Sequence, residues 1–401
     1  MLKETRKIFL VLAIFALAGG FFYNFQELWM AENNLSVKTI SIVFSLCALI
    51  TVSTIFLSSN LIKEKNVKNF CSILLFVKSL LIFSLFMLYS SGLNVLIKLL
   101  IMVDYAINTE IYACIYPMLA MIQKNDRTYA KKDLIYSAMY NTGVLLTGFL
   151  LGKSLGKLQI NYNFYCLSAA ILIFISFVIL RRVNLTDYYS KNEDVNNSND
   201  LLNRLIKNIR KDKISIVYLL FLFNGQISYT CVLSLTVTLL TTGLSFSPQT
   251  AANIMVFMGV FAVILGIILL VKFTFKNNYI TLTIKYVIRA FLYIIAVFLN
   301  SKIVYLIALM YPKIISESYS HITDAPYVNR FDHAFQLAFC NLREMVTYLG
   351  KSIGTLLCGM ALMMGLRFNF IFAAFFAVLQ TIFSFWALYL RTKEDKRDDW
   401  K

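Results

Sequence analysis

The chain contains apolar stretches that are each long enough to cross a membrane as a helix. The clearest lie at residues 8–30, 39–57, 164–180 and 370–390. Because roughly 20 consecutive apolar residues span a bilayer, such stretches favour insertion into lipid over burial in a soluble core. Hydrophobic residues make up 59% of the chain, against about 45–50% of an ordinary soluble domain. The sequence therefore predicts an all-α integral membrane protein.

Division of the chain by apolar length predicts about twelve transmembrane helices. The first apolar stretch follows basic residues, but it is too long and too aromatic for a secretory signal, so we interpret it as a retained span. The expected spans are residues 8–30, 40–59, 70–89, 93–122, 134–157, 162–180, 214–241, 249–272, 279–299, 302–323, 333–362 and 366–390.

Basic residues occur in blocks between the apolar stretches. If the N-terminus is inside, the external loops hold only Lys38, Lys157, Lys302 and Arg367, and the positive-inside rule predicts that both termini are cytoplasmic. The formal net charge of +17 is not gathered on one soluble face, so nucleic acid is not an expected partner. The composition is rich in Lys, Asn and Ile, which favours a bacterial source and hence a location in the bacterial inner membrane. We expect the protein to contact membrane lipid and to be a monomer.

Cysteine and histidine give no pattern for a cofactor or for catalysis. The seven cysteines include no C-x-x-C pair, and neither His321 nor His333 accompanies a nucleophile or a set of metal ligands. We therefore expect no disulfide, no metal, no cofactor and no enzymatic activity.

The longest polar interval lies at the middle of the chain, at residues 181–213, and its run at 191–200 has the composition of a disordered segment. The apolar positions of residues 201–209 form one stripe between basic positions, which favours a short helix on the inner leaflet; a solvated linker is the alternative. The predicted organisation is an N-terminal six-helix bundle at 1–180, this linker at 181–213, a C-terminal six-helix bundle at 214–391 and a cytoplasmic tail at 392–401.

Short motifs recur at a separation close to half of the 401 residues. Each lies inside an apolar segment, as expected for a duplicated membrane bundle, and such internal repeats are typical of secondary transporters. The pairs are Gly152-Lys-Ser-Leu-Gly156 with Gly350-Lys-Ser-Ile-Gly354, Tyr116-Pro117 with Tyr311-Pro312, and Asn24-x-Gln26 with Asn224-x-Gln226.

With six spans, a central loop and six further spans, the chain resembles the major facilitator superfamily of transporters over its whole length. The resemblance implies two bundles related by a pseudo-twofold axis and a substrate cavity lined mainly by the first, fourth, seventh and tenth helices. The paired Asn/Gln and Tyr-Pro motifs fall on those four helices.

The signature motifs of that family are degenerate here. The loop at residues 58–68 is basic but lacks the glycines and the aspartate of the family motif between the second and third helices. The fifth helix has glycines, such as Gly143, without the proline found in drug/proton antiporters, and the usual arginine of the fourth helix is absent. The resemblance thus implies a divergent member, to which the antiport mechanism does not transfer residue by residue.

Ionisable residues within the spans are the main candidates for substrate binding or ion coupling, because each costs roughly 2.5–3.5 kcal/mol to insert. Arg343, Thr347 and Lys351 share one stripe of the eleventh span, beside Glu344. The stripe suits an anionic substrate, and Glu344 is a candidate proton carrier. The alternative is a structural ion pair between helices.

The fourth span carries Asp104, Asn108 and Glu110, which are candidates for proton exchange or for contact with a cationic substrate. The alternative for the acids is pairing across the interior with one of three basic residues: Lys153, Arg289 or Lys351. Two further lysines, Lys98 and Lys285, lie near span ends and are expected to reach the interface, whereas Lys78 is left without an assigned role.

The first span carries Asn24, Gln26 and Glu27, and the seventh carries Asn224 and Gln226. These side chains are candidates for substrate contact, with hydrogen bonding between helices as the alternative.

Small residues and prolines are candidates for close packing or gating. Glycines four residues apart permit close approach of two backbones in lipid, and a proline permits a kink or hinge. The candidates are Pro117, Gly148, Gly152, Lys153, Gly156, Pro312, Gly350 and Gly354.

Together these features favour a secondary transporter that moves a small molecule by alternating access, driven by protons or another ion, with export of an amphipathic compound as the preferred direction. Uptake of a small metabolite is the alternative, and a membrane sensor or a membrane-embedded transferase ranks below both.

Overall fold

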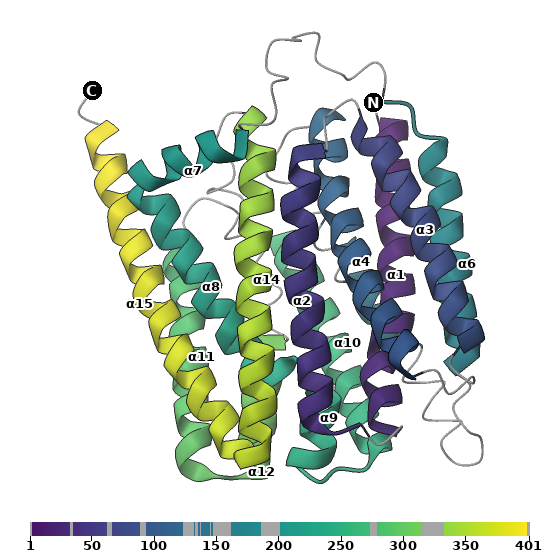
Figure 1. Cartoon of the computed structure of the whole chain (residues 1–401). Helices are drawn as coiled ribbons and strands as arrows, with labels where there is room; N and C mark the ends of the chain where they lie inside the picture. Colours follow the sequence, from purple (N-terminus) through teal and green to yellow (C-terminus); the bar gives the residue numbers. More distant parts are fainter. Residues whose placement is uncertain are drawn as a thin grey trace.

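The computed structural model describes residues 2–32, 35–61, 66–88, 94–122, 162–185, 201–272, 279–313 and 333–398, together with helical positions between 132 and 146. Apart from short turns, these residues are helical (Figure 1). In the membrane a helix satisfies all its backbone hydrogen bonds internally, which is why apolar stretches of this length fold in this way.

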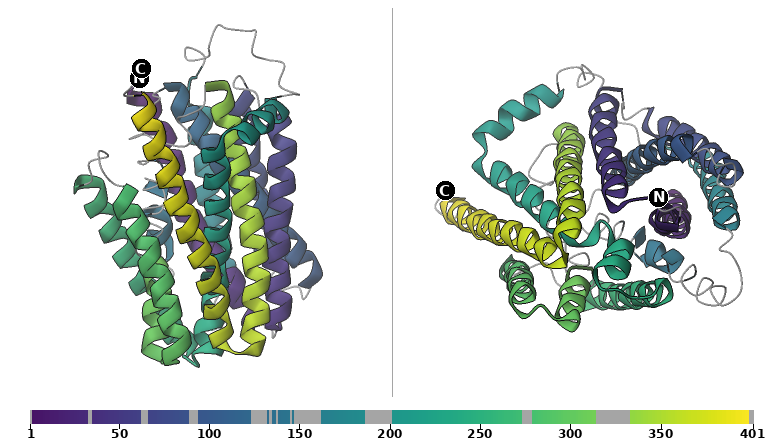
Figure 2. Two further views of the ribbon diagram at one scale, coloured as in Figure 1. Left: turned by 90° about the vertical axis from the view of Figure 1, so that its left-hand side faces the viewer. Right: turned by 60° about the horizontal axis from the view of Figure 1, so that its bottom comes forward.

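The helices form two groups, with α8, α11, α14 and α15 on the left of Figure 1 and α1, α2, α3, α4 and α6 on the right, and Figure 2 shows the same helices in two further views. The N-terminal group consists of α1 (Leu2–Glu32), α2 (Val37–Leu61), α3 (Val67–Leu88), α4 (Asn94–Ile122), the helical positions within 132–146 and α6 (Tyr162–Arg181). The C-terminal group consists of α8 (Lys213–Leu233), α10 (Pro248–Lys272), α11 (Tyr279–Leu299), α12 (Lys302–Tyr311), α14 (His333–Met364) and α15 (Leu366–Asp398).

Within the described residues, seven helices are long and apolar enough to cross a membrane. Their outward faces carry large apolar side chains, such as Phe76, Phe174 and Phe375, which are 41%, 45% and 59% exposed. In water such a surface would be unfavourable, whereas in a bilayer it faces lipid tails. The protein is a multi-pass membrane protein, and α1 begins at the end of the bundle where α15 ends (Figure 1).

Each group buries an apolar core, and that of the N-terminal group also includes Leu235 and Cys358 of the C-terminal half. In the N-terminal group, Ile8, Leu75 and Ile173 of α1, α3 and α6 pack in one cluster, and in the C-terminal group Tyr293 and Phe370 of α11 and α15 pack in another. The two groups meet along α2 and α14, which lie side by side (Figure 1).

The central helix expected from the apolar stripe is present as α7 (Leu201–Lys211). Its Leu205 and Ile209 are buried in a cluster with residues of α8 and α14, so part of the stripe contacts protein. Asp212 follows and caps α8, because its carboxylate accepts the Ile214 backbone N–H at 3.1 Å.

The seventh span differs from the prediction of one continuous helix at 214–241. The α8 helix ends at Leu233, and the chain continues through α9 (Thr236–Thr238) and one π-helical turn, η5 (Leu239–Gly243). Hydroxyl groups accompany this break: the Thr236 side chain donates to the Leu233 carbonyl at 2.8 Å. Such side-chain bonds compete with regular helical bonding, and the hydropathy pattern does not reveal them.

Two other boundaries differ from the sequence prediction. The α15 helix continues to Asp398, beyond the expected end at 390 and into the expected tail. The tenth span is described as helix only to Tyr311, after which residues 312–313 form a π-helical turn and residues 314–323 lie outside the described part of the chain.

Candidate binding cavity

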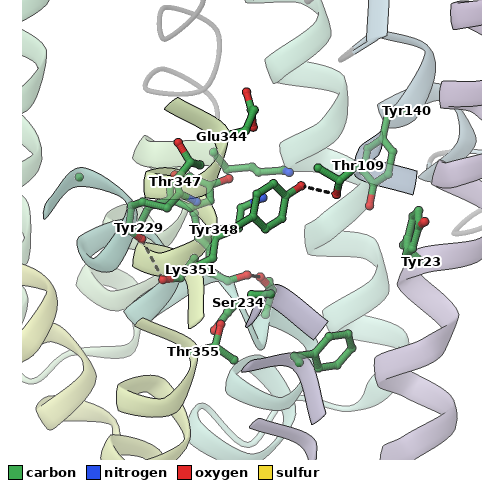
Figure 3. Close-up of a pocket in the computed structure, with 18 of the residues that line it drawn as sticks. Tyr23, Thr109, Tyr140, Tyr229, Ser234, Glu344, Thr347, Tyr348, Lys351 and Thr355 are labelled. Atoms are coloured by element: carbon green, nitrogen blue, oxygen red, sulfur yellow. Dashed lines mark hydrogen bonds between the residues drawn. The ribbon is translucent and has the colours of Figure 1, made fainter. Parts of the chain in front are cut away.

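A cavity of about 540 Å³ lies between the two helix groups. Its walls come from α1, α2, α4 and the helical positions of 132–146 on one side, and from α8 to α11, α14 and α15 on the other. Figure 3 shows side chains of α14 facing Thr109, Tyr140 and Tyr23 of the N-terminal group. The volume is in the range of pockets for small organic ligands, which is about 300–1,000 Å³.

The α14 stripe faces this cavity. Arg343, Thr347, Lys351 and Thr355 all line it, as their spacing of four residues predicts for one helical face. Arg343 forms an ion pair with the adjacent Glu344, which also lines the cavity. The Lys351 Nζ lies 4.3 Å from the centre of the Tyr348 ring, a cation–π contact.

A second basic group, Arg289 of α11, reaches the same wall. Its guanidinium donates to the Gln380 side chain of α15 and lies 5.6 Å from the centre of the Tyr286 ring. Arg289, Gln380 and Tyr286 all line the cavity, and Arg289 is 2% exposed. Among the lining residues, the C-terminal wall carries four cations and one acid, which gives it a net positive charge.

The N-terminal wall is aromatic and carries a single lining acid, Glu27. Four of its tyrosines lie on α4 and in the 132–146 segment: Tyr105, Tyr112, Tyr136 and Tyr140. The ring centroids of Tyr112 and Tyr136 are 4.7 Å apart, and the Tyr136 and Tyr140 rings stack at 6.2 Å.

Asn108 lies on the same wall as these tyrosines. Its Oδ1 is buried and has no hydrogen-bond partner among the described residues. An unpaired buried carbonyl oxygen is costly, so this atom is available to a donor on a bound molecule.

Asp104 does not line the cavity and pairs with Lys78. The Lys78 Nζ is 2.6 Å from Asp104 Oδ1, and both side chains are at most 1% exposed. The Tyr23 hydroxyl donates to Asp104 Oδ2 at 3.1 Å and accepts a bond from Lys78 at 2.9 Å. The alternative that an acid of the fourth span pairs with Arg289 or Lys351 therefore does not hold for Asp104, because these two residues lie on the opposite wall and Lys78 of α3 is a direct neighbour.

Glu27 joins the two helix groups. Its Oε1 accepts the Thr238 backbone N–H at 2.7 Å and the Thr238 hydroxyl at 2.8 Å. Thr238 belongs to α9, in the interrupted seventh span, where the helix break leaves this N–H available to a side chain. Glu27 is 8% exposed and also lines the cavity.

The remaining polar candidates divide between the cavity and the helix interiors. Gln226 lines the cavity, whereas the Asn224 side chain donates to the Leu220 carbonyl of its own helix at 2.8 Å. Gln26 and Glu110 are buried away from the cavity. The side chain of Asn24 lies outside the described residues.

Lys285 was expected at the interface, but it is 5% exposed. Its Nζ lies 4.6 Å from the Tyr286 ring centre, and the residue is more than one turn inside α11. The predicted span and α11 both begin at residue 279, but the Lys285 side chain packs on the neighbouring Tyr286 ring inside the protein, which the position in the span does not reveal.

Gly350 and Gly354 allow α14 to pack closely on α8. A Cβ atom on Gly350 would lie 2.9 Å from the Phe223 carbonyl oxygen, and one on Gly354 would meet the Thr230 hydroxyl and lie 2.8 Å from the Ile227 carbonyl oxygen. The earlier members of this repeat, Gly148, Gly152, Lys153 and Gly156, lie outside the described residues.

The two prolines have different outcomes. Pro312 is buried at the end of α12, where the helix gives way to a π-helical turn, whereas the Pro117 side chain lies outside the described residues. A glycine contact missed from the sequence joins α1 to the fifth helix, because a Cβ on Gly20 would lie 2.9 Å from Gly143 Cα.

Comparison with protein-family models and with curated protein sequences gives no match. Solved structures match over nearly the whole chain. The human organic anion transporter MFSD10 is 12% identical with a TM-score of 0.67, covering 95% of this chain and 98% of that chain. The proton:xylose symporter XylE is 13% identical with a TM-score of 0.68, covering 95% of each chain. The E. coli fucose:proton symporter FucP, in a variant form, is 14% identical with a TM-score of 0.64, covering 96% and 98%.

The chain has the major facilitator superfamily fold. The expected arrangement of twelve helices in two six-helix bundles is thereby confirmed. Within this major facilitator fold, sequence reasoning found the basic stripe of α14, because charged residues stand out in an apolar span. It missed the tyrosine wall, because tyrosine is also an ordinary interfacial residue and its hydropathy gives no signal for a cavity.

Another missed contact crosses between the bundles of this major facilitator fold. The Thr109 hydroxyl of α4 donates to the Tyr348 hydroxyl of α14 at 2.8 Å (Figure 3). Ser45 and Ser352 form a second bridge, from α2 to α14, at 2.7 Å. Single hydroxyls of this kind are common in membrane helices, so no sequence signal distinguishes these.

Proposed function

We propose that this protein is a secondary active transporter that moves a small molecule across the membrane by alternating access. The observation that carries the proposal is the cavity between the bundles, lined by both halves and carrying Arg289, Arg343 and Lys351 on its wall. Charged side chains are costly in lipid and are typical of substrate or ion pathways there. A site at the junction of two bundles is exposed to alternate sides when the bundles rock.

Two structural neighbours support ion coupling. XylE and FucP are named as proton symporters of sugars, and MFSD10 as an organic anion transporter. We infer proton coupling for this chain, with Glu27 and Glu344 as the acids that line the cavity and Asp104 as the acid reached through Tyr23. The tyrosines and methionines that line the cavity beside charged groups suit an amphipathic compound.

Further expectations from the sequence complete the proposal. Export is the direction, the bacterial inner membrane is the location, both termini are cytoplasmic, and the protein acts as a monomer without enzymatic activity. Residues 181–213 form the cytoplasmic connection between the bundles.

The proposal is tested with purified protein in proteoliposomes that contain a pH-sensitive dye, screened against chemically diverse compounds. An Arg343→Ala, Glu344→Gln double variant removes the ion pair of the cavity wall. The matched control is a Lys7→Ala, Glu4→Gln double variant, which removes an ion pair of 2.7 Å that does not line the cavity.

We expect compound-dependent proton movement that is lost in the cavity variant and retained in the control. Vesicles of opposite orientation then distinguish export from uptake by the direction of accumulation. Equal flux in the wild type and the cavity variant would contradict the assignment of the site. Absence of compound-dependent flux of protons or labelled compounds by folded protein would contradict transport itself.

A further inference from the structure

We propose that the N-terminal bundle binds an anionic phospholipid at the end where α1 begins, through Arg181 and Arg182 at the end of α6. The ligand is a membrane lipid whose headgroup carries a net negative charge and whose acyl chains lie along α3 and α6. This inference goes beyond the proposed transport function and does not depend on it, because a lipid can bind at this end whether or not the cavity carries a substrate.

Basic residues of three helices meet at this end of the bundle. The Lys7 side chain of α1 donates to the Arg182 carbonyl oxygen at 2.9 Å, and the Lys68 side chain of α3 donates to the Arg181 carbonyl oxygen at 3.3 Å. The charges of Arg181 and Lys7 also act on Lys68. The tertiary structure therefore gathers four cations from segments that are far apart in the chain.

The acid described within this cluster is Glu4 of α1, and both of its oxygens are engaged. Glu4 Oε1 accepts a bond from Lys7 at 2.7 Å, and Oε2 accepts the Asn184 backbone N–H at 2.8 Å. In the part of the chain that the structure describes, no carboxylate pairs with the guanidinium group of Arg181 or Arg182, and both residues are exposed. Because like charges repel one another, an anion that binds beside them is stabilised.

The lysines and the arginines of the cluster differ in what they contact. The two lysines occupy carbonyl oxygens at the C-terminal end of α6, where the last carbonyls have no partner within the helix. The guanidinium groups of Arg181 and Arg182 extend from the same residues and are left for a ligand. Their planar geometry matches a phosphate group, which can accept two parallel hydrogen bonds from one arginine.

An exposed apolar surface leads to both arginines. Phe174 and Ile175 lie seven residues before Arg181 and Arg182, so each pair shares one face of α6. Phe174 and Ile175 are exposed, as is Phe76 of the neighbouring α3 (Figure 1). In a bilayer these apolar side chains face acyl chains, and arginines at the helix end reach the level of the headgroups. A phospholipid combines both chemistries in one molecule, so it fits this surface better than a soluble phosphate does.

The experiment measures lipid binding to the purified full-length protein by mass spectrometry of the intact protein released from detergent. Phosphatidylglycerol and phosphatidylcholine with identical acyl chains are compared because they differ in net charge. Glycerol phosphate is the third probe, because it has the phosphate without acyl chains. We expect phosphatidylglycerol to bind about tenfold more tightly than phosphatidylcholine, and glycerol phosphate to show no binding at the same concentration.

Variants assign the binding to the end of α6. An Arg181→Gln, Arg182→Gln double variant should weaken phosphatidylglycerol binding by about 10- to 100-fold, because hydrogen bonds to a charged group are lost. An Arg181→Lys, Arg182→Lys double variant keeps both charges and should retain part of the affinity, although an ammonium group lacks the planar fork of arginine.

The matched control is an Arg210→Gln, Lys211→Gln double variant. It also removes two adjacent exposed cations from the C-terminal end of a helix, but α7 packs on the C-terminal bundle, away from the cluster. Affinity for phosphatidylglycerol should change by less than about twofold, because exposed charges at a distance are screened. Thermal unfolding without added lipid confirms that each variant is folded.

Equal affinity for the two phospholipids would overturn the proposal. An equal loss of binding in the α6 and α7 variants would also overturn it, because the preference would then arise from the overall positive charge of this end. Glycerol phosphate that bound as tightly as phosphatidylglycerol would replace the lipid with a soluble phosphate. Failure of the transport assay leaves this inference intact, since lipid binding is measured without any substrate.

Discussion

At the scale of single residues, the buried pair of Lys78 and Asp104 is the most demanding interaction of the N-terminal bundle. Both side chains are almost fully removed from solvent, and Tyr23 bonds to both of them. Removing a charge from water costs several kcal/mol, which only close pairing and full hydrogen bonding repay. The pair therefore constrains α1, α3 and α4 to one relative arrangement.

Breaking this pair should be costly. Lys78→Met and Asp104→Leu are each expected to destabilise the protein by about 3–5 kcal/mol, because each leaves an uncompensated buried charge. The double variant should recover most of the loss, since the pair is then replaced by apolar groups. Thermal unfolding in detergent measures both effects.

Lys98→Met provides the control, because Lys98 is only half-buried in α4 and should change stability little. A double variant no more stable than either single variant would contradict a simple ion pair and would indicate that Tyr23 and Asp104 have a further partner.

At the scale of helices, the packing of α14 on α8 depends on the absence of side chains at two positions. Gly350 and Gly354 each bring their backbone against α8, and the opposing groups are backbone carbonyls as well as the Thr230 side chain. Carbonyl groups of a helix cannot move aside independently, so a methyl group here requires the helices to separate.

Gly354→Ala is therefore expected to destabilise the protein by about 1–3 kcal/mol through overpacking. Thr230→Ala in the same chain should restore part of this loss, because the Thr230 hydroxyl is one of the obstructing atoms. The unfolding temperatures of the single and double variants provide the measurement.

Met360→Ala on the lipid-facing side of α14 serves as the comparison, because Met360 is 54% exposed. If Gly354→Ala were no more harmful than Met360→Ala, close packing of these two helices would not limit stability.

At the scale of the whole molecule, the two bundles are joined near the end where α1 finishes by the Glu27 contact to Thr238. This contact places a carboxylate of one bundle on the backbone of the other, at the interruption of the seventh span. Hydrogen bonds to a charged group contribute about 1.5–3 kcal/mol, which is enough to shift the population of two states substantially.

Removing this contact should let the bundles separate at that end. Spin labels placed at the exposed positions Lys38 and Thr242, in a background without native cysteines, report the distance between the bundles by electron paramagnetic resonance. We expect Glu27→Leu to add a population at longer distances.

Glu4→Leu is the matched control, because Glu4 lies on the same helix but accepts the Asn184 backbone N–H within its own half of the chain. A distance distribution that is identical in the wild type and in Glu27→Leu would show that other contacts, such as that of Ser45 with Ser352, hold the bundles together.

The sequence by itself determined the membrane-spanning class, the helical composition and the shared face of Arg343, Thr347 and Lys351. These properties depend on residues close together in the chain, because apolar length and helical periodicity are local. The degenerate motifs did not obscure them, since the fold needs only apolar spans of the right number and order.

Only the tertiary structure decided which of the buried polar groups meet. It paired Asp104 with Lys78, placed Glu27 on Thr238 and left Gln26 outside the cavity although Glu27 lines it. Adjacent residues of a helix point about 100° apart, so a small rotation of the helix exchanges a cavity position for a buried one. Packing against helices that are distant in the chain sets this rotation, as in the packing of α14 against α8 and α2. The hydropathy of the sequence does not predict the rotation.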